Sequence, residues 1–302
     1  MPAYVSHVRY VALAVPDLLT EAEFFETTWG LTREAEHEGC LYFAARGSAE
    51  PFILRLRQTA ERRTDLFALA ALSAAHVDQL HDSLTSEGVE IVSTPAALEQ
   101  PGGGYGFRFF DFEGRLVEVS ADVAQRRSSP PEPRSGLPLG LSHVVFHAPD
   151  VSATVAWYEE HLGLKVSDWL DQFMCFMRGH GPKHHCMAFV AGAPTLNHVA
   201  FELANMDEMM RGMGRMMKAR MPPKWGPGRH TAGDNSFAYF NSPAGFMIEY
   251  TAEVESLPED WTPRSFPRAA DVMDQWGTGR LAGPADYPPL KPDPALWVAC
   301  EV

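Results

Sequence analysis

Two stretches of the chain share one pattern of apolar and polar positions. Residues 10–31 (YVALAVPDLLTEAEFFETTWGL) and 143–164 (HVVFHAPDVSATVAWYEEHLGL) each begin as an apolar strand, turn at Pro-Asp and continue as an amphipathic stretch that ends at Gly-Leu. Asp17 and Asp150 follow a proline and can cap the first turn of a helix. A glycine ends each helix, where a residue that tolerates positive φ is needed. The pattern predicts one strand–turn–helix unit that occurs twice.

The repeat continues further along the chain. Residues 107–119 (FRFFDFEGRLVEV) match residues 238–250 (AYFNSPAGFMIEY) as strand, turn and strand. The offset between the copies is 133 residues at the front (143 − 10) and 131 at the end (249 − 118). Because a nearly constant offset indicates a duplication, the predicted fold class is α+β with two similar domains in tandem.

A segment without periodicity separates the two copies. QRRSSPPEPRSGLP (125–138) is rich in Pro, Ser and Arg and interrupts helix and strand alike. We therefore expect an N-terminal domain at 1–124, a linker at 125–138 and a C-terminal domain at 139–252. Residues 253–302 hold many prolines and three tryptophans, and we expect them to form an irregular arm over the second domain or a neighbouring subunit.

Composition argues against several classes of protein. Lys and Arg number 25 against 39 Asp and Glu, and the net charge of −14 comes without a basic stripe, which argues against nucleic-acid binding. No uncharged apolar run approaches the ~20 residues of a membrane span, and the N-terminus lacks the pattern of a secretory signal. Four dispersed cysteines without a CxxC motif suit a reducing compartment. We expect a cytoplasmic protein without a membrane or nucleic-acid partner.

Seven of the twelve histidines lie between residues 143 and 198, which points to a metal site. Since a strand rises ~3.3 Å per residue, His143 and His147 would lie ~13 Å apart and could not bind one ion together. The same spacing separates His198 from Glu202. One ligand from each of three strands is therefore expected. Two imidazoles and one carboxylate form a facial triad that suits Fe(II), and three such ligands also fit zinc or manganese.

Alignment of the two copies on the Pro-Asp turn shows which copy can bind the metal. The second copy has two histidines and a glutamate at positions where the first copy keeps only the glutamate: His143 against Tyr10, His198 against approximately Ala68, and Glu249 against Glu118. We expect the first copy to bind no metal and the second copy to hold the site.

Five stretches of the second copy carry a resemblance to a known family: LSHVVFHAPD (141–150), KHHCMAFV (183–190), LNHVAFEL (196–203), GPGRHTAGDNSFAYF (226–240) and SPAGFMIEY (242–250). In this order and spacing they resemble the vicinal oxygen chelate superfamily and, within it, the two-domain type I extradiol ring-cleaving dioxygenases. The resemblance covers roughly residues 5–252.

The resemblance implies a fold, a metal and a reaction. Each domain would consist of paired βαβββ modules that form a curved mixed sheet around a cavity, and only the C-terminal domain would be catalytic. Fe(II), with Mn(II) as the alternative, would bind His143, His198 and Glu249. The enzyme would cleave the ring of a catechol-type aromatic diol with O2 in aromatic catabolism, and it would be a homo-oligomer.

The same resemblance implies a proton-handling group beside the metal. His185 stands 13 residues before His198 (198 − 185), where type I enzymes carry a catalytic histidine. His184 competes for this role, and as neighbours on a strand the two would point to opposite faces. Cys186 follows where the family often has Asp.

His230 and Tyr239 complete the implied site. They stand nine positions apart (239 − 230), like an active-site histidine and a tyrosine of the family that hydrogen-bonds a substrate hydroxyl. Candidate wall residues of the substrate pocket are Phe173, Met187, Phe189 and Trp225.

Two other functions stay open at this level. A glyoxalase-like isomerase or epimerase of the same superfamily generally builds its metal site from both halves or from two chains, and the first copy here lacks the histidines for that. A bleomycin-resistance-type binding protein needs no metal, so the six candidate residues of the second copy argue against it. A catechol, an aminophenol and a heterocyclic diol would chelate similarly, and the sequence does not choose among them.

Overall fold

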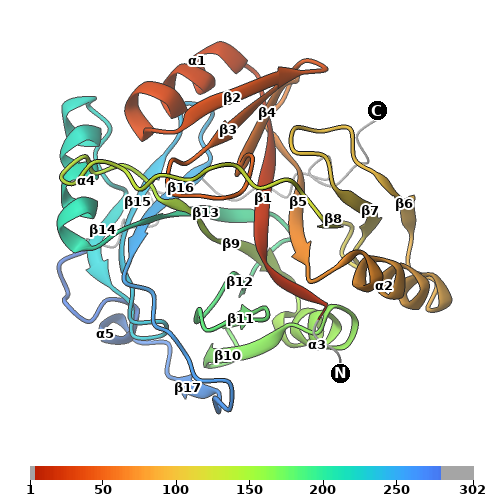
Figure 1. Cartoon of the computed structure of the whole chain (residues 1–302). Coiled ribbons are helices and arrows are strands. Elements are labelled where there is room, and N and C mark those ends of the chain that lie inside the picture. Colours follow the sequence, from red (N-terminus) through yellow and green to blue (C-terminus); the bar gives the residue numbers. More distant parts are fainter. Residues whose placement is uncertain (1–3, 280–302) are drawn as a thin grey trace.

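The computed structural model describes residues 4–279, which form two mixed β-sheets with few helices (Figure 1). The first sheet has eight strands and the second has nine. Each sheet is built from two consecutive βαβββ modules, so the predicted fold class is confirmed.

The first sheet follows the N-terminal part of the chain. Its first module consists of β1 (Val5–Val15), α1 (Leu18–Glu23) with the π-helical turn η1 (Phe24–Trp29), β2 (Thr32–His37), β3 (Cys40–Ala44) and β4 (Leu54–Gln58). Its second module consists of β5 (Arg63–Ala71), α2 (Ala74–Ser86), β6 (Ile91–Ala97), β7 (Tyr105–Phe110) and β8 (Leu116–Ala121). In the strand order β2-β3-β4-β1-β5-β8-β7-β6, the modules meet where β1 and β5 pair antiparallel.

The second sheet repeats this arrangement. Its modules are β9 (Gly140–Ala148), α3 (Val151–Leu162), β10 (Lys165–Leu170), β11 (Met174–Arg178) and β12 (Met187–Ala191), then β13 (Leu196–Leu203), α4 (Met206–Lys218), β14 (Trp225–Arg229), β15 (Ser236–Asn241) and β16 (Met247–Ala252). The order is β14-β15-β16-β13-β9-β12-β11-β10-β17, where the edge strand β17 (Arg264–Phe266) was not predicted by the repeat. A short helix, α5 (Ala270–Met273), follows it.

The Pro-Asp turns begin helices as the sequence predicts. Asp17 and Asp150 each accept a hydrogen bond from the backbone N–H three residues on, at 3.0 Å. The helical segments end at Gly30 and Gly163, whose φ angles of 96° and 67° lie in the left-handed region. The repeat in the sequence is therefore a repeat of capped helices in the structure.

Aromatic side chains join the two sheets. Trp29 at the end of η1 stacks on Tyr250 of β16 with ring centroids 3.8 Å apart, and Phe67 of β5 packs on Phe146 of β9 at 4.8 Å. All four side chains are fully buried. Since Tyr250 follows Glu249 directly, the N-terminal half supports the strand that carries one of the candidate ligands.

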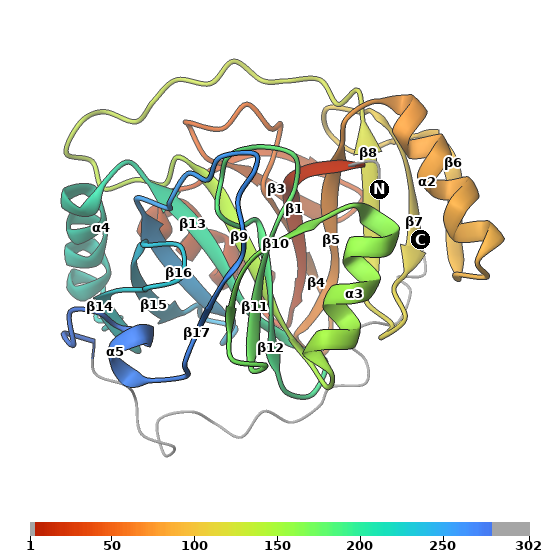
Figure 2. The same cartoon turned by 90° about the horizontal axis from the view of Figure 1, so that it is seen from below.

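The segment between β8 and β9 (122–139) contains no helix or strand and passes beside α4 (Figure 2). Arg215 of α4 donates to the carbonyls of Ser135 and Gly136 at 2.9 and 2.7 Å. The segment is thus fastened to the second half, while a division of the chain into domains at 124 and 139 stays a prediction.

Helix α4 carries the methionine-rich stretch, and Met209, Met213 and Met216 are buried on its inner face. The methionines therefore belong to the core, as the helical spacing indicates. Among residues 4–279, none of the helices has the length and apolar character needed to cross a membrane.

Candidate metal centre and active site

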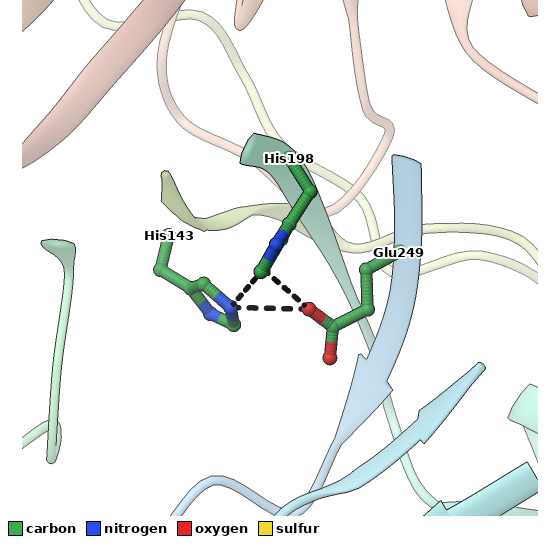
Figure 3. Close-up of side chains that lie close together, drawn as sticks. All are labelled: His143, His198 and Glu249. Atoms are coloured by element: carbon green, nitrogen blue, oxygen red, sulfur yellow. Dashed lines mark hydrogen bonds and ion pairs between the residues drawn. The ribbon is translucent and has the colours of Figure 1, made fainter. Parts of the chain in front are cut away.

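The three candidate ligands lie on three adjacent strands at the centre of the second sheet (Figure 3). Ala200 of β13 lies opposite both His143 of β9 and Glu249 of β16. His198 stands two residues before Ala200 and therefore points to the same face of the sheet. Strand register thus brings together residues that are far apart in the sequence.

The ligand atoms form a small triangle. Nε2 of His143 lies 3.2 Å from Oε2 of Glu249, Nε2 of His198 lies 3.0 Å from the same oxygen, and the two nitrogens are 3.4 Å apart. Atoms bound ~2.1 Å from one ion at right angles lie about 3 Å apart. All three side chains are buried, and Oε1 of Glu249 has no hydrogen-bond partner among the described residues. The donor set fits one divalent cation.

Burial and charge favour the protonation states that a metal needs. Burial lowers the pKa of His143, so its imidazole is neutral at neutral pH. Burial opposes the ionisation of Glu249, but the facing His143 and His198 outweigh it and hold the pKa of this carboxyl well below its usual range. Neutral histidines and an ionised glutamate are the forms that bind metal.

His185 lies beside this triangle, its ring centroid 4.3 Å from that of His143. The expectation that His184 and His185 point to opposite faces of a strand is wrong, because both precede β12 in a loop and both are buried. Nδ1 of His184 lies 2.8 Å from Nδ1 of His185, and Nε2 of His184 lies 2.9 Å from Oδ2 of Asp168. Neither histidine lies on the surface.

The carboxylate of Asp168 sets the direction of the hydrogen bonds from His185 through His184 to Asp168. Asp168 accepts hydrogen bonds from Arg264 of β17, and burial that would raise its pKa is outweighed by His184 and Arg264, so the carboxyl is ionised. A neutral His184 donates from Nε2 to this carboxylate and accepts at Nδ1 the proton of His185 Nδ1. Nε2 of His185 is left with its lone pair. Asp168 and His184 thus form a series of hydrogen bonds that leads to His185.

His230 and Tyr239 form a second pair next to the triangle. Tyr239 lies opposite Glu249 in the register of β15 and β16, and its ring centroid is 5.0 Å from that of His198. Nδ1 of His230 lies 2.7 Å from the carbonyl oxygen of Met273 and must donate to it, so Nε2 accepts the hydroxyl proton of Tyr239 at 3.1 Å. The structure therefore brings all six predicted site residues together.

In the first sheet, the positions equivalent to the three candidate ligands do not form a metal site of this kind. Ala68 lies opposite both Tyr10 and Glu118, as Ala200 lies opposite His143 and Glu249. The predicted equivalence of Ala68 and His198 is therefore wrong by two residues, because Leu66 occupies the equivalent place on β5. Glu118 accepts hydrogen bonds from Gln100 at 2.9 Å and from Arg108 at 3.0 Å. A guanidinium group here neutralises the glutamate.

The triangle opens into a cavity of about 1060 Å³. Phe173 and Trp225 line it as predicted, but Met187 and Phe189 do not, because they lie on the opposite face of β12 in the main core. Sequence reasoning missed wall residues from the N-terminal half and from the C-terminal arm: Glu61, Arg62, Thr64, Arg268, Val272 and Met273. No local motif marks these positions, since only the tertiary fold brings them to the cavity.

Comparisons with known proteins support this arrangement. A family model described as the Glyoxalase/Bleomycin resistance protein/Dioxygenase superfamily matches residues 140–250. The crystal structure of a Mn(II)-bound glyoxalase from Novosphingobium aromaticivorans superposes with a TM-score of 0.95 at 42% identity, over 99% of each chain. The chain belongs to this superfamily. Within it, Metapyrocatechase 2 of Cupriavidus necator is 29% identical over 91% of this chain and 90% of its own length.

A further member of the superfamily, the iron-dependent extradiol dioxygenase of Rhodococcus jostii strain RHA1, is 25% identical over 68% of this chain and 74% of its own length. The relatives thus include a Mn(II)-bound protein named a glyoxalase and an iron-dependent protein named an extradiol dioxygenase.

Proposed function

We propose that the protein is an Fe(II)-dependent extradiol dioxygenase that opens the ring of a catechol-type aromatic with O2 in aromatic catabolism. The arrangement of His143, His198 and Glu249 on one wall of a large cavity carries this proposal. Two neutral imidazoles and a carboxylate are the donor set of non-haem Fe(II) oxygenases. Fe(II) held there would supply the electron transfer that lets an aromatic diol react with O2. Mn(II) is the alternative ion, in view of the Mn(II)-bound relative.

His185 is proposed as the proton acceptor. Its Nδ1–H is directed to His184, so the lone pair of Nε2 is available to a substrate hydroxyl in the cavity. Burial lowers the pKa of His185 well below its usual range, so the ring is neutral and carries this lone pair before substrate binds. Asp168 balances the positive charge that the His184–His185 pair gains.

Tyr239 and His230 are proposed to hold the substrate oxygens. Because the proton of Tyr239 points to His230, the phenol oxygen can accept a hydrogen bond from a substrate hydroxyl. Rotation of the O–H bond makes Tyr239 a donor once that hydroxyl has lost its proton. The pair can therefore follow the change of charge on the substrate.

The cavity walls favour a substituted ring. A cluster of apolar side chains from β10–β12 and α5 faces the cavity, including Leu170, Phe173, Met174, Val190 and Val272. A single-ring catechol leaves much of a 1060 Å³ cavity empty, so we propose substrates with a further apolar group. An aminophenol or a heterocyclic diol with such a group offers the same pair of donor atoms.

A glyoxalase-like isomerase is the second candidate, since the relative at 42% identity is named a glyoxalase. All three candidate ligands, however, come from the second half of one chain. The first half offers Tyr10, Leu66 and an arginine-paired Glu118 at the equivalent positions. This difference supports the dioxygenase.

One assay separates the candidates. The protein is loaded anaerobically with Fe(II) or Mn(II), mixed with substituted catechols, aminophenols and heterocyclic diols, and exposed to O2 while O2 uptake and absorbance are followed. Uptake with a coloured ring-opened product supports the proposal. A metal-loaded protein that consumes no O2 with any of these compounds contradicts it and favours the isomerase, whereas a folded protein that binds no metal favours a binding protein.

The proposal includes a cytoplasmic homo-oligomer. Cys40, Cys175 and Cys186 are free thiols in the described part of the chain, which suits a reducing compartment. Sedimentation of the purified protein tests the assembly.

A further inference from the structure

A chain of hydrogen bonds leads away from the imidazole of His198. Nδ1 of His198 lies 2.6 Å from Oδ1 of Asn197, and Nδ2 of Asn197 lies 2.9 Å from Nε2 of His147 on β9. Nδ1 of His147 lies 3.0 Å from the hydroxyl of Thr195, which donates to the carbonyl oxygen of Ala193 at 3.2 Å. His147 was set aside as a ligand by its spacing from His143, and the proposed reaction does not use it.

The carbonyl oxygen of Ala193 is the last acceptor of this series of hydrogen bonds, and it fixes the direction of each bond before it. A backbone carbonyl only accepts, so the hydroxyl proton of Thr195 is committed to Ala193. His147 must then donate from Nδ1 and keep a lone pair on Nε2. That lone pair accepts from the amide NH2 of Asn197, and the amide oxygen therefore accepts the Nδ1 proton of His198. Nε2 of His198 is left unprotonated toward Glu249.

The opposite direction would disable the ligand. If the amide of Asn197 were turned over, its NH2 group would face Nδ1 of His198, and the proton of that ring would move to Nε2. A protonated Nε2 cannot bind a metal. Only the neutral Nδ1–H form of His147 prevents this, and burial lowers the pKa of His147 to about 4, aided by the charge of Arg115.

The surroundings reserve space for the His147 ring. A Cβ at Gly192 would lie 2.8 Å from Cδ2 of His147, although the φ angle of Gly192 is outside the left-handed region. The absence of a side chain at 192 thus serves the ring rather than the backbone. Arg115 of the N-terminal half donates to the carbonyl of His147 at 2.8 Å and holds its backbone.

We propose that His147 is a positioning residue that, through Asn197, selects the tautomer and orientation of His198 needed to bind the metal. The inference rests on the metal site of the proposed function. It assigns a role to a histidine that the proposed reaction does not use.

The test compares three variants in the whole protein. His147→Leu removes the chain, and His147→Gln keeps an acceptor for the Asn197 amide. His161→Leu is the matched control, since His161 is also a largely buried histidine but lies on α3 outside the cavity. Fe(II) alone and Mn(II) alone are titrated anaerobically, and the ring nitrogens of His198 are followed by nitrogen-15 NMR in the metal-free protein.

His147→Leu is expected to weaken metal binding about 10- to 100-fold and to give a mixture of His198 tautomers. His147→Gln is expected to restore most of the affinity, and His161→Leu to bind as the unmodified protein does. Unchanged affinity and an unchanged tautomer in His147→Leu would overturn the inference. If His147→Leu does not fold, Gly192→Ala displaces the same ring and has to show the same loss. The tautomer signal needs no metal and no reaction, so it stands apart from a failure of the dioxygenase proposal.

Discussion

Arg115 offers a sharp test of how the two halves are joined beneath the candidate site. Its side chain is completely buried between the sheets, where Nη1 donates to Oδ2 of Asp111 at 2.8 Å and Nη2 donates to the carbonyl of His147 at 2.8 Å. The guanidinium carbon also lies 5.6 Å from the ring centre of Phe146. The guanidinium also forms an ion pair with the largely buried Glu113. Arg115→Met keeps most of the length of the side chain but leaves the carboxylates of both Asp111 and Glu113 without their cation.

The expected cost follows from that burial. Removing one partner of a buried ion pair destabilises a protein by about 3–5 kcal/mol, because the other charge stays buried. Tyr158 still donates to Oδ2 of Asp111 at 2.8 Å and Thr154 to Oε1 of Glu113 at 2.9 Å, which keeps the expected loss within this range, about 3–5 kcal/mol. The free energy of unfolding of the metal-free protein in urea measures it.

Two further variants serve as controls. Arg211→Met breaks an exposed pair with Asp207 on α4 and should cost less than about 1 kcal/mol. Asp111→Asn in the Arg115→Met background removes one of the two unpaired charges and should recover part of the loss. A loss in Arg115→Met no larger than in Arg211→Met would refute the reasoning that burial makes the ion pairs of Arg115 costly to break.

Three further predictions concern the site. Tyr239→Phe removes the hydroxyl that bonds to His230, and kcat/KM should fall roughly tenfold while metal affinity is unchanged; equal loss of both would contradict a role in substrate binding. The pKa of His147 is lowered to about 4, so at this residue the unfolded chain binds more protons between pH 6.5 and 4. As pH falls through this window, His147 alone should remove up to about 3 kcal/mol of stability from the metal-free protein, and His147→Leu should lose correspondingly less than the unmodified protein. A phenyl substituent that buries ~100 Å² of apolar surface against Phe173 and its neighbours should lower KM about tenfold or more relative to catechol; equal KM values would contradict the proposed apolar subsite.

The elements that could be predicted from the sequence depend on local patterns. Asp17 and Asp150 cap helices because the capping bond joins residues three apart, and the repeat shows the pattern twice. The spacing limit along a strand excluded His147 and His143 as joint ligands of one ion. Short-range physics therefore predicted the modules and the choice of one ligand per strand.

The errors concern register and strand boundaries. Ala68 was matched to His198 because FALAALSA and LNHVAFEL are both apolar, and a shift of two residues leaves such a pattern unchanged. Met187 and Phe189 were predicted to line the cavity. The alternation of residues along β12 separates its two faces, but it does not show which face borders the cavity. His184 was placed on a strand that begins three residues later, at Met187.

The long-range contacts of two arginines could not be predicted. Arg264 reaches Asp168 from β17, and Arg62 reaches the cavity from the N-terminal half, across separations of 96 residues or more. No local pattern in the sequence marks either arginine. Part of the predicted arm, 280–302, lies outside the described residues.

Incorporation of labelled oxygen tests the central claim most directly. The Fe(II)-loaded protein reacts with a substituted catechol under oxygen-18 gas, and the ring-opened product is analysed by mass spectrometry, with Glu249→Gln as the control. The account predicts label from O2 in the ring-opened product of the unmodified protein and no product from Glu249→Gln. A metal-loaded protein that returns the catechol unchanged, or a product without label, would contradict it.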